Sequence, residues 1–251
     1  DWSDQDPVDW CWGAEVWPSD TPASGVRMVA PTPALAVHDL EFRWAGGASF
    51  LLRLPTLTLH RGRSLFLHGP SGSGKSTLLN LIGGVLLPTK GRVELLGQPL
   101  CGLSARRRDA FRADHLGFIF QQFNLLPYLS VLDNVLLPCR FSARRARQAR
   151  DPQAEARRLL GALDLDPGLL GRPAAALSVG QQQRVAAARA LIGQPEILMA
   201  DEPTSALDAE RQAAFVTLLL SEARRAGSSV VFVSHDIRLA SHFDQLMVLD
   251  A

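Results

Sequence analysis

Short runs of consecutive apolar residues alternate along this chain with longer segments in which apolar positions recur every three or four residues. The first pattern is typical of buried strands and the second of helices. We expect strands over residues 35–44, 50–59, 64–68, 91–95, 116–120, 197–200, 230–234 and 246–249. We expect helices over residues 75–83, 105–113, 131–137, 153–163, 178–192, 209–226 and 237–243. Because the runs at 64–68, 197–200 and 230–233 are apolar without interruption, they predict a parallel sheet covered on both faces.

The order of these elements predicts one α/β domain over residues 35–251 rather than two independent domains. The first hundred residues add β-hairpin material, and residues 122–176 contain predicted helices only, so we expect a helical insertion, or helical subdomain, there. Residues 1–34 precede the first predicted strand. Because residues 1–27 show neither period and contain three prolines, we expect a disordered tail or an extension outside the fold. A docking peptide that uses its tryptophans is the alternative.

Composition narrows the class of protein. Hydrophobic residues make up 47% of the 251 residues and charged residues 20%, which is globular composition and excludes a collagenous, coiled-coil or disordered chain. No apolar run approaches the roughly 18 residues that a membrane-spanning helix needs, and the acidic first ten residues do not resemble a signal peptide. Three widely spaced cysteines fit neither a disulfide framework nor a metal site, and they suit a reducing cytosol. A net charge of only +1 gives no argument for a nucleic-acid partner.

Arginines cluster at positions 106–108 and again at positions 144, 145, 147 and 150. We interpret both clusters as solvated helical faces. The alternatives are a membrane-surface or nucleic-acid contact and, for the second cluster, a contact with a partner of the helical insertion.

A phosphate-binding loop is the strongest local signal. Residues 69–77 match the pattern G-x-x-x-x-G-K-[ST] between a predicted strand and a predicted helix, the context that such a loop requires. The glycines let backbone N–H groups and the helix N-terminus face an anion, Lys75 reaches the outer phosphates, and Ser76 holds Mg²⁺. The nucleotide-binding candidates here are Gly69, Pro70, Ser71, Gly72, Ser73, Gly74, Lys75, Ser76 and Thr77.

Two carboxylates follow the predicted strand at 197–200. Parallel strands bind ligands at their carboxyl ends, so this strand places Asp201 and Glu202 at the same edge as the phosphate loop. We expect Asp201 to bind Mg²⁺ and Glu202 to orient and deprotonate an attacking water. An ordinary solvated strand end is the alternative for this pattern alone.

A third element precedes the acidic strand. Residues 177–181 read LSVGQ and lead into a helix, with Ser178 as a candidate N-cap and therefore a second anion site. In this segment the chain resembles the ATP-binding cassette (ABC) ATPases, whose signature is LSGGQ. Val179 departs from that signature, whereas Ser178, Gly180 and Gln181 match it. The resemblance implies that these three residues bind ATP held by a facing subunit.

The resemblance covers about residues 35–250 and implies roles for further residues. It implies that Gln121 joins the core to the insertion and touches the metal, although the adjacent Gln122 is the alternative. Asp208 matches the D-loop of the family, and His235 matches its switch histidine, which contacts the γ-phosphate. Trp44 matches the aromatic residue that stacks on adenine; a simple core or edge aromatic is the alternative for this residue. Glu202, His235 and Gln121 are thus the catalytic candidates, and Ser76, Gln121 and Asp201 the metal ligands.

The resemblance also implies a function. Within the family, the chain looks most like the ATPases of lipoprotein-release and macrolide-export systems. We expect a P-loop ATPase that binds ATP and Mg²⁺, forms a head-to-tail homodimer, and powers a separate integral-membrane permease by closing that dimer. Such a subunit lies in the cytoplasm, peripherally at the inner face of the cell membrane. A non-transport ABC ATPase of DNA repair or the ribosome is one alternative, and a monomeric P-loop kinase or GTPase is another.

Overall fold

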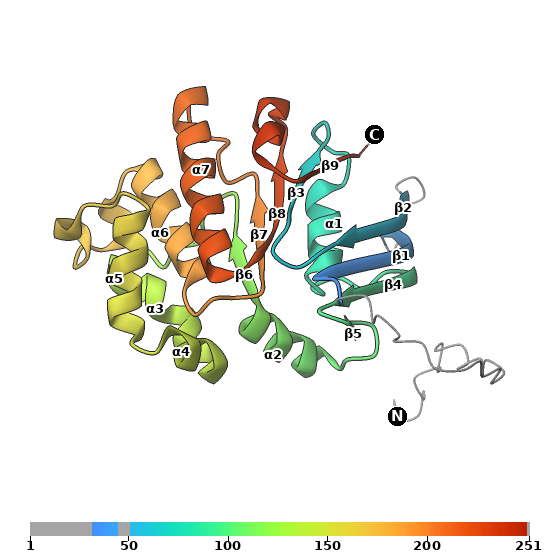
Figure 1. Cartoon of the computed structure of the whole chain (residues 1–251), viewed down its shortest axis with the longest axis horizontal. Coiled ribbons are helices and arrows are strands. Elements are labelled where there is room, and N and C mark those ends of the chain that lie inside the picture. Colours follow the sequence, from blue (N-terminus) through green and yellow to red (C-terminus); the bar gives the residue numbers. More distant parts are fainter. Residues whose placement is uncertain (1–31, 45–50, 250–251) are drawn as a thin grey trace, which may run out of the picture. The chain divides into compact units, whose positions relative to one another are not determined.

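The computed structural model describes residues 32–44 and 51–249, so the predicted tail at residues 1–27 lies outside the described residues. A five-stranded parallel sheet forms the centre of the fold (Figure 1). Its strands, in spatial order, are β6 (Leu116–Ile119), β7 (Ile197–Asp201), β8 (Ser229–Ser234), β3 (Ser64–His68) and β9 (Gln245–Val248). Every neighbouring pair in this sheet is parallel, which confirms the predicted parallel sheet.

Both faces of the parallel sheet are covered, and this explains the uninterrupted apolar runs. Alternate residues of a strand point to opposite faces. Phe66 of β3 and Phe232 of β8 contribute to one apolar cluster, whereas their neighbours Leu67 and Val231 contribute to the other. A strand that is buried on both sides has no position left for a solvated side chain.

A smaller antiparallel sheet covers one side. Its order is β2 (Leu51–Leu59), β1 (Leu35–Arg43), β4 (Lys90–Leu95) and β5 (Gln98–Pro99). Helix α1 (Lys75–Ile82) lies between the two sheets in Figure 1, and its buried leucines belong to the same apolar cluster as β1, β2 and β4. The predicted β-hairpin material is therefore present. β5 was not predicted, because two residues are too short to show a period of two.

Helices cover the opposite side of the parallel sheet. Between β6 and β7 lie α3 (Val131–Phe141), α4 (Ala143–Ala149), α5 (Pro152–Ala162), short 3-10 turns at Pro167–Leu169 and Ala174–Ala176, and α6 (Val179–Leu191). Helix α2 (Ala105–His115) precedes β6, and α7 (Ala209–Ala226) follows β7. The predicted helix at 237–243 is a 3-10 helix, Ile237–His242. Among the described residues, none of the helices is both long enough and apolar enough to cross a bilayer.

Helix α4 was not predicted, and one of its arginines corrects the interpretation of the arginine clusters. Arg145 is not solvated; it is 2% exposed. Its guanidinium donates to the backbone oxygens of Ile192 at 2.8 Å, Ala190 at 2.6 Å and Leu116 at 3.2 Å. Burial lowers the pKa of Arg145 to about 10, and the three carbonyl acceptors compensate for the lost hydration.

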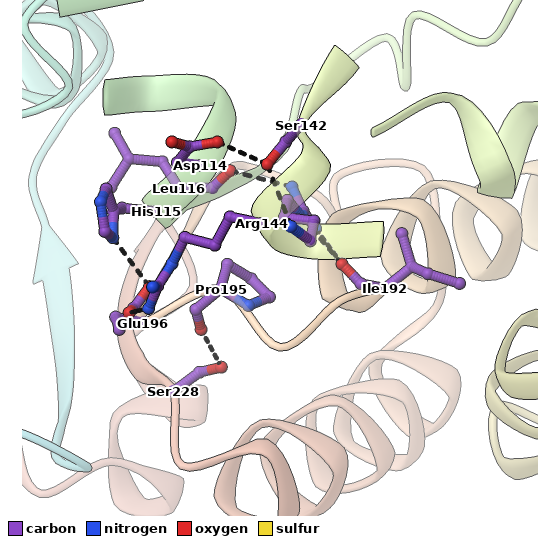
Figure 2. A network of polar contacts seen from close by, with 10 residues as sticks. Asp114, His115, Leu116, Ser142, Arg144, Ile192, Pro195, Glu196 and Ser228 are labelled. Atoms are coloured by element: carbon purple, nitrogen blue, oxygen red, sulfur yellow. Dashed lines mark hydrogen bonds and ion pairs between the residues drawn. The ribbon is translucent and has the colours of Figure 1, made fainter. Parts of the chain in front are cut away.

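Figure 2 shows the polar network around this helix. Arg144 pairs with Glu196, which also contacts His115 Nδ1 at 3.1 Å. Ser142 donates to Asp114. Burial raises the pKa of Glu196, but the hydrogen bond with His115 and further favourable contacts outweigh it, so the pKa lies below its ordinary value. The network attaches the start of α4 to α2, to β6 and to the segment that precedes β7.

Candidate active site

The loop between β3 and α1 has the backbone geometry that a phosphate group requires. Gly72 and Gly74 have φ angles of +86° and +90°, a region that glycine adopts without strain. Gly74 is the N-cap of α1, and no side-chain hydrogen bond caps this helix. Gly69 permits a close approach, since a Cβ there would lie 2.7 Å from the backbone oxygen of Leu249. The uncapped N–H groups at this helix end are suited to an anion.

Lys75 is held inside this loop. Its side chain is buried, and its Nζ donates to the backbone oxygens of Gly69 and Pro70, both at 2.8 Å. The same Nζ lies 3.6 Å from Oε1 of Glu202. The loop and the acidic end of β7 therefore meet at the ammonium group of Lys75.

Asp201 ends β7 beside Ser76. Its Oδ1 is buried and has no hydrogen-bond partner among the described residues. Burial raises the pKa of Asp201, and the neighbouring Ser76 hydroxyl opposes that rise. Carboxylate and hydroxyl oxygens are ligands that Mg²⁺ prefers, so the orphaned oxygen and the hydroxyl fit a magnesium ion.

Glu202 has an unusual backbone and two charged neighbours. Its φ is +44°, although it is not glycine and precedes a proline, so the backbone is strained there. Its Oε1 faces Lys75, and its Oε2 lies 3.4 Å from Nδ1 of His235. His235 follows β8 and is 59% exposed at its side chain, so it reaches Glu202 from the solvent side.

A cavity of about 380 Å³ brings half of the predicted site residues together. It is lined by Trp44, Ser71, Gly72, Gly74, Lys75, Ser76, Thr77, Gln121 and Glu202. Gln121 lines this cavity and Gln122 does not, which favours Gln121 of the two alternatives. Trp44 also lines this cavity and is half exposed, so it is not a core residue. Its ring is edge-on to that of Phe42, with a distance of 5.2 Å between the ring centroids.

A second cavity, of about 550 Å³, contains the LSVGQ segment instead. Its lining includes Ser178, Val179, Gly180 and Gln181 and, from the loop after β7, Ala206 and Leu207. Ser178 is the N-cap of α6, as predicted: its Oγ accepts from the N–H of Gln181, and Gln181 Oε1 accepts from the N–H of Ser178 at 2.9 Å. The capping box thus occupies the Gln181 side chain, which was predicted to bind nucleotide.

The remaining predicted residues lie outside the first cavity. Asp208 is the N-cap of α7 and accepts from the N–H of Arg211 at 3.0 Å. Gly69, Pro70 and Ser73 belong to the phosphate loop without lining the cavity. One chain therefore does not place Ser178 and Gly180 beside Lys75; it presents them at a separate cavity.

Sequence reasoning missed the polar side chains that hold the active-site loops. Gln183 and Arg189 of α6 and Gln212 of α7 each donate to backbone oxygens of a loop that carries a predicted site residue. In the sequence they are ordinary polar residues of amphipathic helices, Gln183 and Gln212 beside other polar residues, which is the pattern of any solvated face. No signal in the sequence distinguishes them.

The chain is similar to known ATP-binding proteins. The family model described as "ABC transporter" matches residues 52–205. The ABC transporter ATP-binding protein YbbA of Escherichia coli is 42% identical over 193 residues, which covers 77% of this chain and 83% of YbbA. The lipoprotein-releasing system ATP-binding protein LolD of Shewanella denitrificans is 41% identical over 218 residues, 86% of this chain and 92% of LolD.

Solved structures agree with these relatives. The dimeric structure of MJ0796, an ABC transporter cassette of Methanocaldococcus jannaschii, has a TM-score of 0.75 at 35% identity, and 86% of this chain and 94% of that chain are covered. A post-hydrolysis dimer of MJ0796 bound to ADP and Pi has a TM-score of 0.74 at 36% identity, with the same coverage.

Proposed function

The chain belongs to the ABC transporter family and is an ATPase of that family, and from this premise we propose that two copies bind and hydrolyse ATP between them to power a separate membrane permease. The observation that carries this proposal is the division of the predicted site. Lys75 and Glu202 line one cavity, and Ser178 and Gly180 line another. Each chain thus offers two different halves of a nucleotide site.

In the proposed dimer a twofold axis combines these halves. In a head-to-tail dimer with C2 symmetry, the phosphate loop of each copy faces the LSVGQ segment of the other. Two complete sites result, one on each side of the axis. The N-terminus of α6, with Ser178 as its cap, then faces an anion bound at Lys75 of the partner, which is the position that a helix dipole favours.

The first cavity fits ATP and Mg²⁺. The uncapped N–H groups of the phosphate loop and Lys75 are suited to phosphate oxygens, and the exposed ring of Trp44 is suited to a purine. Ser76, Asp201 and Gln121 would hold Mg²⁺, and the orphaned Asp201 oxygen supports this assignment. When bound, the metal ion neutralises charge on the phosphate oxygens.

Glu202 and His235 are the residues that we assign to the hydrolytic step. The Glu202 carboxylate lines the cavity and accepts a proton from water as a general base. His235, 3.4 Å from Glu202, orients that carboxylate and contacts the outer phosphate. Asp208 and the LSVGQ residues act from the facing copy.

An apolar hollow of about 350 Å³ is our candidate for the permease contact. It lies between the core and the helical subdomain, where Val85, Phe118, Phe120 and Pro138 contribute to its lining. Val85 is 53% exposed and Phe120 40% exposed, so the hollow presents apolar surface to a partner. Because LolD is among the similar relatives, we propose a permease of the lipoprotein-release or macrolide-export type, with this chain at the cytoplasmic face of the membrane.

Glu202→Gln tests the dimer. The variant keeps the size and hydrogen-bonding capacity of the side chain but removes the base, so hydrolysis should slow by roughly 10²–10⁴-fold while ATP binding survives. With ATP and Mg²⁺ it should elute as a dimer in size-exclusion chromatography. Adding Ser178→Arg should return it to a monomer, because the arginine blocks the facing half-site. A Glu202→Gln/Ser178→Arg protein that remains dimeric would refute the proposed interface.

A further inference from the structure

Helix α6 carries two polar side chains among buried neighbours. Gln183 is 1% exposed, and Arg189 lies on a helix whose residues Val185, Ala186 and Ala187 are fully buried. The N-terminus of this helix is Ser178, in the second cavity. A buried amide such as that of Gln183, and a partly buried guanidinium such as that of Arg189, require hydrogen-bond acceptors. In both cases the acceptors belong to loops of the candidate active site.

Gln183 holds the loop that carries Glu202. Its Nε2 donates to the backbone oxygen of Pro203 at 2.8 Å, one residue after the strained Glu202. From the other side, Gln212 of α7 donates to the backbone oxygens of Thr204 at 3.1 Å and Leu207 at 3.0 Å. Two side-chain amides, one from each flanking helix, therefore clamp the loop between β7 and α7.

Arg189 holds the loop that carries Gln121. Its guanidinium donates to the backbone oxygens of Phe123 at 2.5 Å and Asn124 at 2.7 Å. Phe123 and Asn124 have φ angles of +59° and +48°, so two consecutive non-glycine residues are left-handed directly after Gln121 and Gln122. Such a turn persists only where its surroundings hold it, and Arg189 supplies that hold.

The clamped loop after β7 belongs to both cavities. Glu202, at the start of this loop, lines the first cavity, which also contains Lys75. Ala206 and Leu207, near the end of the loop, line the second cavity, which also contains Ser178. Helix α6 contributes Ser178 to the second cavity and fixes both catalytic loops of the first. One rigid helix thus connects the two half-sites of the chain.

On the basis of the proposed two-copy site, we infer that Gln183 and Arg189 are positioning residues for ATP hydrolysis, through which α6 sets the Glu202 loop and the Gln121 loop. The same helix carries Ser178 at its N-terminus, so a nucleotide held by the partner would contact the helix that positions Glu202 of this chain. A purely structural role, satisfaction of buried carbonyl groups, is the competing explanation.

Gln183→Met separates the two explanations, because methionine keeps the length of the side chain and loses the donor. In the full chain we expect kcat for ATP to fall about 10-fold or more, since a small misplacement of a catalytic group is sufficient for such a loss, with KM changed less than about 2-fold. Gln182→Met is the matched control: Gln182 is the neighbouring residue of α6, and its amide donates to Ala174 and Leu177 instead of the catalytic loop. This control leaves the amide donor to the Glu202 loop in place, so hydrogen exchange in residues 202–207 should match that of the wild type.

A double-mutant cycle shows whether Gln183 acts through Glu202. In a Glu202→Gln background the base is absent, so Gln183→Met should not lower the residual rate further. The same logic applies to Arg189→Met in a Gln121→Ala background, and Arg189→Lys, which retains one donor group, should recover part of kcat. Equal fold losses in both backgrounds, or a fall in kcat that only follows a lower melting temperature, would overturn the inference.

Amide hydrogen exchange gives a readout that needs no turnover. Without nucleotide, Gln183→Met should speed exchange in residues 202–207, and Arg189→Met in residues 121–126, while exchange in residues 178–182 should stay as in the wild type in both. Unchanged exchange in both loops would overturn the positioning role even if the wild-type chain dimerises with ATP as proposed. A wild-type chain that does not dimerise would refute the proposed function instead, and the exchange result would still decide whether these side chains hold the loops.

Discussion

Glu202 shows how several local constraints meet at one residue. Its backbone is left-handed, it precedes a proline, and its carboxylate faces both Lys75 and His235. Because the strained conformation has no compensation within Glu202 itself, the neighbouring loop must supply it. The buried amide of Gln183 on the Pro203 carbonyl is such a compensation. The position of the carboxylate that we assign as the base therefore depends on the neighbouring residues and not only on its residue type.

Asp244 is a residue whose charge contributes to the fold instead of the site. Its carboxylate accepts from the N–H of Ser64 at 2.8 Å and from its Oγ at 2.7 Å, and it pairs with Arg63 at 3.1 Å. The hydrogen bond from the Ser64 side chain holds the pKa of Asp244 below its ordinary value, against the opposing effect of burial. These contacts fix the start of β3 beside the start of β9.

Replacement of this carboxylate gives a pH-dependent prediction. Asp244→Asn should lower the free energy of unfolding at pH 7 by about 1.5–3 kcal/mol, the usual value of hydrogen bonds to a charged group. Since the pKa is depressed in the folded state, the stabilisation by Asp244 is present above the unfolded pKa and is lost as pH falls through the folded pKa. Urea titrations should therefore show a constant difference between pH 7 and 5 that narrows below about pH 4. A difference that grows on acidification would contradict the assignment.

At the scale of elements, α6 contacts the loops of the candidate active site, whereas α4 joins the helical subdomain to the core. Helix α6 connects the second cavity to both catalytic loops of the first. Helix α4 attaches the helical subdomain to the core, because Arg145 reaches the end of α6 and the start of β6 at once. Gly193 belongs to the same junction: a Cβ there would lie 2.6 Å from Arg145.

Arg145→Met tests the role of α4. It removes the donor from three buried carbonyl groups, so the free energy of unfolding should fall by about 3 kcal/mol, which corresponds to roughly 6–12 °C in Tm for a domain of this size. Arg147→Met, on an exposed position of the same helix, is the control and should leave Tm nearly unchanged. A calorimetric scan that finds equal Tm values for the two variants would show that Arg145 does not anchor the subdomain.

The elements differ in how far the sequence predicts them. The buried strands are uninterrupted apolar runs and α7 has a clear helical period, and α7 spans Ala209–Ala226, the predicted range. Helix α4 is short and rich in arginine, so the sequence alone predicts a solvated side chain for Arg145. The carbonyl groups that accept its hydrogen bonds come from distant segments of the chain. The phosphate loop is local in sequence and was predicted whole. The contacts of Gln183 and Arg189 join segments that are 20 and 65 or 66 residues apart, and no local pattern reports them.

At the scale of the whole molecule, the central feature is a chain with two unlike half-sites. Lys75 and Ser178 lie in separate cavities, and in the function that we propose a second copy completes each site. ATP would then stabilise the dimer that it occupies, and hydrolysis would release that dimer. A permease bound at the apolar hollow beside β6 would follow this cycle through the helical subdomain.

The most direct test counts ATP in two copies joined in one polypeptide by a flexible linker, with Glu202→Gln in both copies to prevent turnover. Placing Lys75→Ala in one copy and Ser178→Arg in the other spoils both halves of one site and leaves the second intact, so one ATP should bind tightly per joined pair. Placing both substitutions in the same copy spoils each site once, so no ATP should bind tightly. Equilibrium dialysis should therefore detect one tightly bound ATP per joined pair when the substitutions are in different copies, and none when they are in the same copy. The opposite result, with tightly bound ATP only when one copy carries both substitutions, would show that each chain completes its own site and would contradict the two-copy site.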